Sequence, residues 1–270
     1  MRAGRLKTRR YRPYHRRRWG LWILLLGALC LAAAWFFRDG GIDLFAAPAP
    51  TLSPDEAARD SRTVTLPGDA WYALQLGVFE SETAAREFAS GYQARGAAGY
   101  ITGTDSFRVL AAAYPARADA QAVQANLRAQ HGVDAYVYEL SRPEITLRLS
   151  GQKAQLTALS DAYDFISQLA NQLSALSQAM DSQEMEGAEV INALRSQRET
   201  LSGLSLRLKT LFAASPHAAV TQIAGLLDDL DASLAAAEQA QGNARLGAQV
   251  KYCQLLALDR MAAYAQGLTR

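Results

Sequence analysis

The fold of this chain is decided by a pattern that occurs twice, first as YALQLGVFESETAAREFASGYQARGAAGYI over residues 72–101 and then as FRVLAAAYPARADAQAVQANLRAQHGVDAYV over residues 107–137. Each copy has a strand with an aromatic residue at both ends, a polar turn, a helical run and a second short strand. An internal repeat at a fixed spacing is the signature of a repeated structural unit, and this signal does not depend on the helix or strand propensity of single residues. Each copy is therefore interpreted as a βαβ unit.

Two βαβ units in tandem predict a βαββαβ fold, the ferredoxin- or RNP-like four-stranded antiparallel sheet with two helices on one face. We expect the other face of this sheet to be open. The fold class of the whole chain is α+β, because a separate all-α bundle is predicted after the sheet. One N-terminal transmembrane helix is predicted before it.

Strand parity divides the side chains between the two faces, because successive residues of a strand point to opposite sides. The residues expected beneath the helices are Tyr72, Leu74, Leu76, Ile101, Phe107, Val109, Ala111 and Val137. The residues expected on the open face are Ala73, Gln75, Gly77, Tyr100, Arg108, Leu110, Ala112, Tyr136 and Tyr138.

The open face contains the candidate ligand-binding residues, which are Gln75, Gly77, Tyr100, Arg108, Leu110, Tyr136 and Tyr138. Flat rings offer contact area at a low entropic cost, and an amide with a guanidinium supplies fixed donors. Such a surface suits a neutral or weakly anionic polymer. Strand propensity alone is a competing explanation, since exposed strands often carry Tyr.

The repeats resemble the SPOR (sporulation-related) domain family through QLGVF at residues 75–79, FRV at 107–109 and GVDAYV at 132–137. The resemblance covers residues 70–141. It implies a domain that binds septal peptidoglycan, specifically glycan strands that lack stem peptides, in cell division or sporulation.

Matched position by position, the family's first-strand glutamine corresponds to Gln75, and Arg108 to its polar third-strand position. One departure from the family pattern is Ala112-Ala113-Tyr114, where a Gly-Pro-aromatic sequence is usual.

The N-terminus predicts the location of the protein. Residues 1–18 hold nine Lys or Arg and no acid, and residues 19–37 carry no charge. A helix of that length spans roughly 28 Å, close to the hydrocarbon thickness of a bilayer. Basic residues stay on the cytoplasmic side, so we expect a single-pass cell-membrane protein with its C-terminus outside the cytoplasm. A cleaved signal peptide is the alternative, although the sequence lacks good cleavage features.

A flexible linker is expected over residues 38–69, which are rich in Ala, Pro, Asp and Gly. Removing the nine N-terminal cations from the 28 basic residues leaves 19 against 26 acidic residues, a net charge of −7. The exported part therefore lacks the basic surface that a nucleic acid requires.

The region 142–270 is predicted to form the helical domain. A short strand at residues 145–149 precedes four helical runs from residue 152 onward, with breaks at 181–187, 213–216 and 241–243. Ser215-Pro216 has the composition of a helix start. Apolar residues spaced by three and four predict an up-and-down bundle that binds a partner or self-associates through 152–270.

We predict no enzyme activity, metal site or cofactor. HExxH and GxSxG motifs are absent from the sequence. His217 stands near a helix start, and the cluster of Glu184, Glu186 and Glu189 is more typical of a solvated turn than of a metal site. Cys253 lies on an apolar stripe, where packing is the simpler explanation.

Three functions from different classes follow from these observations. The first is a membrane protein that binds septal peptidoglycan. The second is a structural or oligomerising scaffold at the cell envelope. The third is an RNP-like nucleic-acid module, against which the predicted topology argues.

Overall fold

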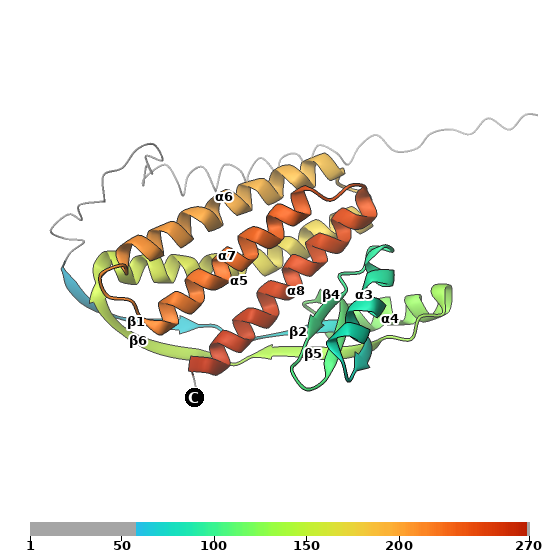
Figure 1. Cartoon of the computed structure of the whole chain (residues 1–270), viewed down its shortest axis with the longest axis horizontal. Helices are drawn as coiled ribbons and strands as arrows, with labels where there is room; N and C mark the ends of the chain where they lie inside the picture. The colour runs from blue at the N-terminus through green and yellow to red at the C-terminus, as the bar shows by residue number, and fades with distance from the viewer. Residues whose placement is uncertain (1–57, 269–270) are drawn as a thin grey trace, which may run out of the picture. The chain divides into compact units, whose positions relative to one another are not determined.

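The computed structural model describes residues 58–268, which contain a four-stranded antiparallel sheet with the order β3-β4-β2-β5. Figure 1 labels β2, β4 and β5 of this sheet. The strands are β2 (Asp69–Phe79), β3 (Tyr100–Thr102), β4 (Phe107–Tyr114) and β5 (Tyr136–Arg142), and the helices between them are α3 (Glu82–Gln93) and α4 (Arg117–His131). This arrangement confirms the predicted βαββαβ fold. Local signals set the helix ends: the Ser81 hydroxyl accepts from the amide of Ala84 at 3.2 Å, and Gly132 ends α4 with φ +63°.

The face beneath α3 and α4 carries the apolar set that strand parity predicts. Leu74, Leu76, Val109 and Ala111 form a buried cluster with small residues of both helices. The aromatic and branched residues packed around this cluster include Tyr72, Ile101, Phe107 and Val137. The prediction for this face is therefore confirmed.

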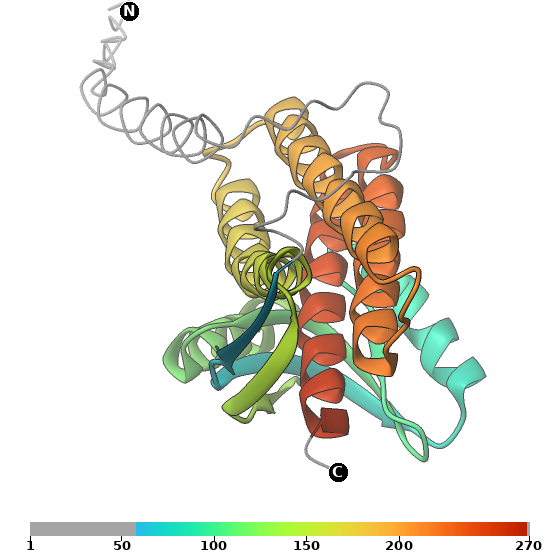
Figure 2. The ribbon, with the colours of Figure 1, turned by 90° about the vertical axis from the view of Figure 1, so that its left-hand side faces the viewer.

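A two-stranded ribbon adjoins the sheet and was not predicted in full. Strand β1 (Arg59–Leu66) pairs antiparallel with β6 (Ile145–Gln152), beside the start of α5 (Figure 2). The placement of 59–66 in the flexible linker is wrong, because the alternation of Val64 and Leu66 with threonines makes a half-buried strand. Only its partner strand was recognised from the sequence.

The ribbon continues the β2–β5 pair across a break in both strands. Pro67 and Pro143 interrupt the ladders, since proline has no amide hydrogen to donate. The two chains approach closely at this break, where a Cβ on Gly68 would lie 2.8 Å from the amide nitrogen of Glu144. The buried Arg142 donates to Asp69 at 2.9 Å and ties the strands together.

Four helices follow, which are α5 (Lys153–Asp181), α6 (Gly187–Leu211), α7 (Ala218–Glu238) and α8 (Asn243–Leu268). Neighbours in sequence pack together, and α8 also packs on α5, which closes the bundle. The predicted start of α7 at Ser215-Pro216 is two residues early. The cap is His217, whose Nδ1 accepts from the amide of Ala219 at 3.3 Å.

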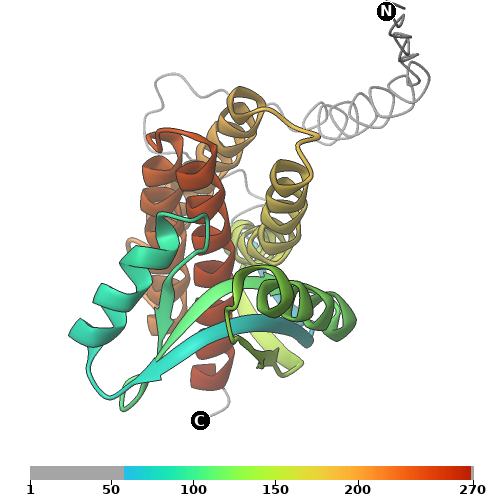
Figure 3. The same cartoon turned by 90° about the vertical axis from the view of Figure 1, so that its right-hand side faces the viewer.

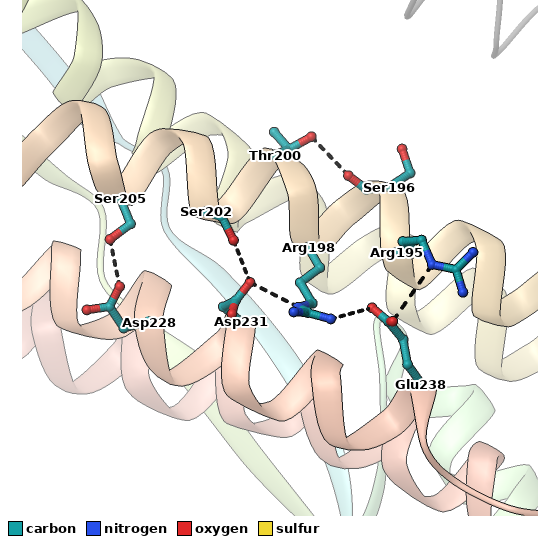
Figure 4. A network of polar contacts seen from close by, with 9 residues as sticks. All are labelled: Arg195, Ser196, Arg198, Thr200, Ser202, Ser205, Asp228, Asp231 and Glu238. Atoms are coloured by element: carbon teal, nitrogen blue, oxygen red, sulfur yellow. Dashed lines mark hydrogen bonds and ion pairs between the residues drawn. The ribbon is translucent and has the colours of Figure 1, made fainter. Parts of the chain in front are cut away.

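Polar side chains link α6 to α7 along their exposed edge (Figure 4). Ser202 and Ser205 each donate to an aspartate of α7 at 2.7 Å, namely Asp231 and Asp228. Arg198 contacts both Asp231, at 3.4 Å, and Glu238, at 3.3 Å. The half-exposed position of these groups limits their contribution to stability, and their regular spacing favours one register of the two helices.

The bundle is not separate from the sheet. One continuous core cluster contains Trp71, Ala73, Leu110 and Leu140 of the sheet together with the interior of α5 to α8. Helix α8 packs on β3, β4 and β5, on the side of the sheet opposite to α3 and α4 (Figure 3). The expectation of an open second face is therefore wrong for the part of that face that the bundle covers.

No helix within residues 58–268 is long and apolar enough to cross a membrane. The predicted transmembrane segment 19–37 and the basic tail 1–18 lie outside the described residues.

Candidate functional site

Helix α8 covers part of the face on which the candidate ligand-binding residues were placed, including positions on β3 and β4. Leu110 of β4 is 0% exposed and Tyr100 of β3 is 5% exposed. The Tyr100 ring packs edge-on against Tyr252 of α8, with the ring centroids 5.2 Å apart. Both residues lie on the face that parity assigned to them, and both are inaccessible to a ligand.

Polar contacts fix α8 in this position. The two carboxylate oxygens of Asp259 accept from the hydroxyls of Tyr100 and Thr102, each at 2.8 Å. The buried amide of Gln254 donates to the carbonyl oxygen of Ala113 at 3.2 Å. Burial and the neighbouring Asp259 raise the pKa of Tyr100, so its phenol remains a proton donor.

Two register shifts in the β2–β4 pair change which residues face outward. They flank Gln75, and after the second shift Gly77 pairs with Val109 and Val78 pairs with Arg108. A Cβ on Gly77 would lie 3.0 Å from the Phe79 ring, which packs on the core beneath α3 and α4. The expectation that Gly77 faces outward is therefore wrong, because the bulge turns it toward the helices.

The bulge places Val78 outward instead, where it is 48% exposed. Sequence parity missed this residue, because a single-residue bulge reverses the alternation and leaves no clear signal in the sequence.

The outward residues that remain exposed or partly exposed form a strip across three strands. This exposed strip consists of Arg108 of β4, Gln75 and Val78 of β2, and Tyr136 and Tyr138 of β5. Gln75 lies between the other strands, paired with Leu110 on one side and with Tyr136 on the other. The Arg108 guanidinium carbon lies 5.4 Å from the centroid of the Tyr138 ring, a cation–π contact.

The exposed strip has the chemistry of a polar, flat recognition surface. Tyr136 is 65% exposed and presents most of its ring to solvent. Gln75 and Arg108 add an amide and a guanidinium, and none of the five residues is acidic. The strip can therefore stack on a ring and donate several hydrogen bonds.

The other sequence candidates have structural roles. The Glu189 carboxylate accepts from the amide of Glu186 at 3.0 Å and so caps α6. Cys253 is buried 3.0 Å from the Ser233 hydroxyl, and burial raises its thiol pKa to about 11. Within residues 58–268, no group of three His, Cys, Asp or Glu side chains is placed to hold a metal ion.

A polar hollow of about 670 Å³ lies away from the exposed strip. It is lined by the ends of the β1–β6 ribbon and by the loop after α6, including Arg59, Ser150 and Gln155. One of its lining side chains already has a partner within the protein, since Gln155 donates to the carbonyl oxygen of Leu211 at 2.9 Å. None of the hollow's lining residues belongs to the exposed strip.

Residues 68–139 match the family model of the SPOR domain. Domains of this family bind peptidoglycan in cell division and are binding domains rather than catalytic ones. The match confirms the resemblance stated from the repeats. Comparisons with curated proteins and with solved structures gave no match.

Proposed function

We propose that this is a single-pass membrane protein whose SPOR domain binds septal peptidoglycan outside the cytoplasm. The ligand is a glycan strand without stem peptides, and the role is in cell division or sporulation. Residues 19–37 anchor the chain, and the basic tail lies in the cytoplasm. The helical domain holds the sheet and offers a surface to a protein partner or to a second copy.

The observation that carries the proposal is the exposed strip within a domain of the peptidoglycan-binding family. Sugar rings present apolar faces and many hydroxyls, so a ligand of this class needs flat rings together with neutral and cationic donors. Tyr136 and Tyr138 supply the rings, and Gln75 and Arg108 supply the donors. The Arg108–Tyr138 contact holds the guanidinium across the strip before a ligand arrives, which reduces the entropic cost of binding.

The binding test uses the full-length chain in detergent, sedimented with glycan strands that an amidase has stripped of peptides. Arg108→Ala and Gln75→Ala are each expected to weaken binding at least tenfold. The matched control is Arg117→Ala, which removes an arginine that lies 5.2 Å from the Tyr72 ring on the opposite face. Equal binding by all variants would refute the assignment of the strip.

The cellular test follows a fluorescent fusion in the native cell. We expect the wild-type protein at septa and the Arg108→Ala variant spread along the membrane. Substitutions are preferable to deletion of 68–139, because the sheet shares its core with the bundle and deletion would expose that core. A topology reporter after Arg270 should report from outside the cytoplasm, and a cytoplasmic signal would revive the nucleic-acid alternative.

A further inference from the structure

Helix α8 belongs to two layers at once. Its residues Val250, Cys253 and Leu255 are 0% exposed within the core that the bundle and the sheet share. On the sheet side it carries Tyr252, Gln254 and Asp259, which contact β3 and β4 as described above. Few of its side chains are therefore available to solvent.

Departure of α8 from the sheet would be costly. It would expose Leu110 and Tyr100 on the sheet, together with the α8 residues that cover them. It would also leave the Asp259 carboxylate and two hydroxyls without their partners. Because α8 packs on α5 and α7 as well, its departure would also remove one of the four helices of the bundle from its neighbours.

We infer that α8 is a permanent cover over the part of the outer face that includes Tyr100 and Leu110, and that it confines the glycan to the exposed strip. This inference rests on the proposed function and defines its binding surface. The helix therefore determines which part of the SPOR sheet contacts the glycan, and binding requires no movement of α8.

The confinement gives the ligand a direction. The strip crosses β4, β2 and β5, which is two inter-strand spacings or about 10 Å. Toward β3 the strip is bounded by α8, and along β5 it is bounded by Leu140, which is 8% exposed in the core shared with the bundle. At Tyr136 the strip reaches the edge of β5, which pairs only with β2 within the described residues. A saccharide that stacks on Tyr136 can continue past this free edge of the sheet, whereas the side toward Tyr100 is closed.

A cross-link tests whether α8 must move. Thr102→Cys with Asp259→Cys places two thiols at a contact between β3 and α8, in a full-length chain that also carries Cys30→Ala and Cys253→Ala. A short bismaleimide then joins them. We expect peptide-free glycan strands to bind the cross-linked and the untreated protein with affinities within twofold of each other. A tenfold or greater loss on cross-linking would overturn the inference.

Two further measurements separate this inference from the proposed function. Among variants, Tyr100→Phe should leave glycan affinity within twofold of wild type, and Tyr136→Ala should lower it at least tenfold. A Tyr100→Phe loss equal to that of Tyr136→Ala would count against the cover.

If the wild-type chain bound no glycan, the proposed function would fail, and amide exchange without ligand would still decide the inference. The amides of 110–113 and of α8 should exchange no faster than those of α5 and α7. Earlier exchange confined to α8 and β4 would show that the cover opens.

Discussion

Two parts of the outer sheet face carry residues that strand parity treats alike, yet the exposure of these residues differs. On β3 and β4, Tyr100 and Leu110 are at most 5% exposed beneath α8. On β5, Tyr136 is 65% exposed although it occupies the same face. The difference teaches that alternation along a strand sets the direction of a side chain, whereas its accessibility depends on a segment more than a hundred residues away in the chain.

The largest expected effect on stability is at the covered part of the face. Leu110→Ala removes a fully buried side chain from the shared core and should lower the free energy of unfolding by about 2–5 kcal/mol. Val78→Ala is the matched control, because Val78 is outward and 48% exposed; its cost should remain below about 1 kcal/mol. Denaturant unfolding measures both. Equal costs for the two variants would contradict the cover by α8.

The next largest effect concerns the hydrogen bonds that Asp259 of α8 accepts from Tyr100 and Thr102 of β3. Asp259→Ala leaves two hydroxyls without their acceptor and should cost about 1–3 kcal/mol. In a double-mutant cycle with Tyr100→Phe, the two costs should add to more than the cost of the double variant, because both changes remove one interaction. Simple additivity would mean that the Tyr100–Asp259 hydrogen bond adds nothing to stability.

Much of the sheet could be predicted from the sequence because its determinants are local. The repeat fixed the order of elements, and parity identified the core beneath α3 and α4, including Leu74 and Val109. The helix ends were predicted well, but both helices begin two to three residues earlier than expected, at Glu82 and Arg117, within the predicted polar turns. Gln75, Arg108, Tyr136 and Tyr138 were also placed on the correct face.

The covering helix could not be identified from one apolar stripe, although a signal was present. Besides Val250, Cys253 and Ala257, α8 carries buried Leu255 and Leu258 outside that stripe. A helix that is apolar on more than one side packs against two layers, and this pattern favours a second contact. Which surface supplies that contact is a non-local property, and neither Asp259 nor the bulge at Gly77 could be assigned without coordinates.

The pH dependence of stability sharpens the comparison of covered and exposed tyrosines. Burial raises the pKa of Tyr100, and burial with nearby Asp181 raises that of Tyr114 to about 12. An unfolded tyrosine ionises near pH 10, so above that pH the unfolded chain binds fewer protons than the folded chain. The free energy of unfolding should therefore be unaffected by these groups below about pH 9 and fall between about pH 10 and 12.

Unfolding in denaturant at several alkaline pH values measures this slope, which is at most about 1.4 kcal/mol per pH unit for each buried phenol. Tyr100→Phe should make the slope shallower, since it removes one buried phenol. A slope that Tyr100→Phe leaves unchanged would contradict the burial of this phenol beneath α8.

The smallest effect on stability is expected where the effect on binding is large. Tyr136→Ala removes a ring that is mostly in solvent, so the free energy of unfolding should change by about 0.5 kcal/mol or less. The same change removes the stacking surface of the exposed strip and should weaken glycan binding at least tenfold. Thermal unfolding and glycan sedimentation on one preparation measure the two effects together. If stability and binding were lost in parallel, Tyr136 would support the fold. If binding alone were lost, Tyr136 would be a contact to the ligand, because a residue outside the core affects affinity through the surface it presents.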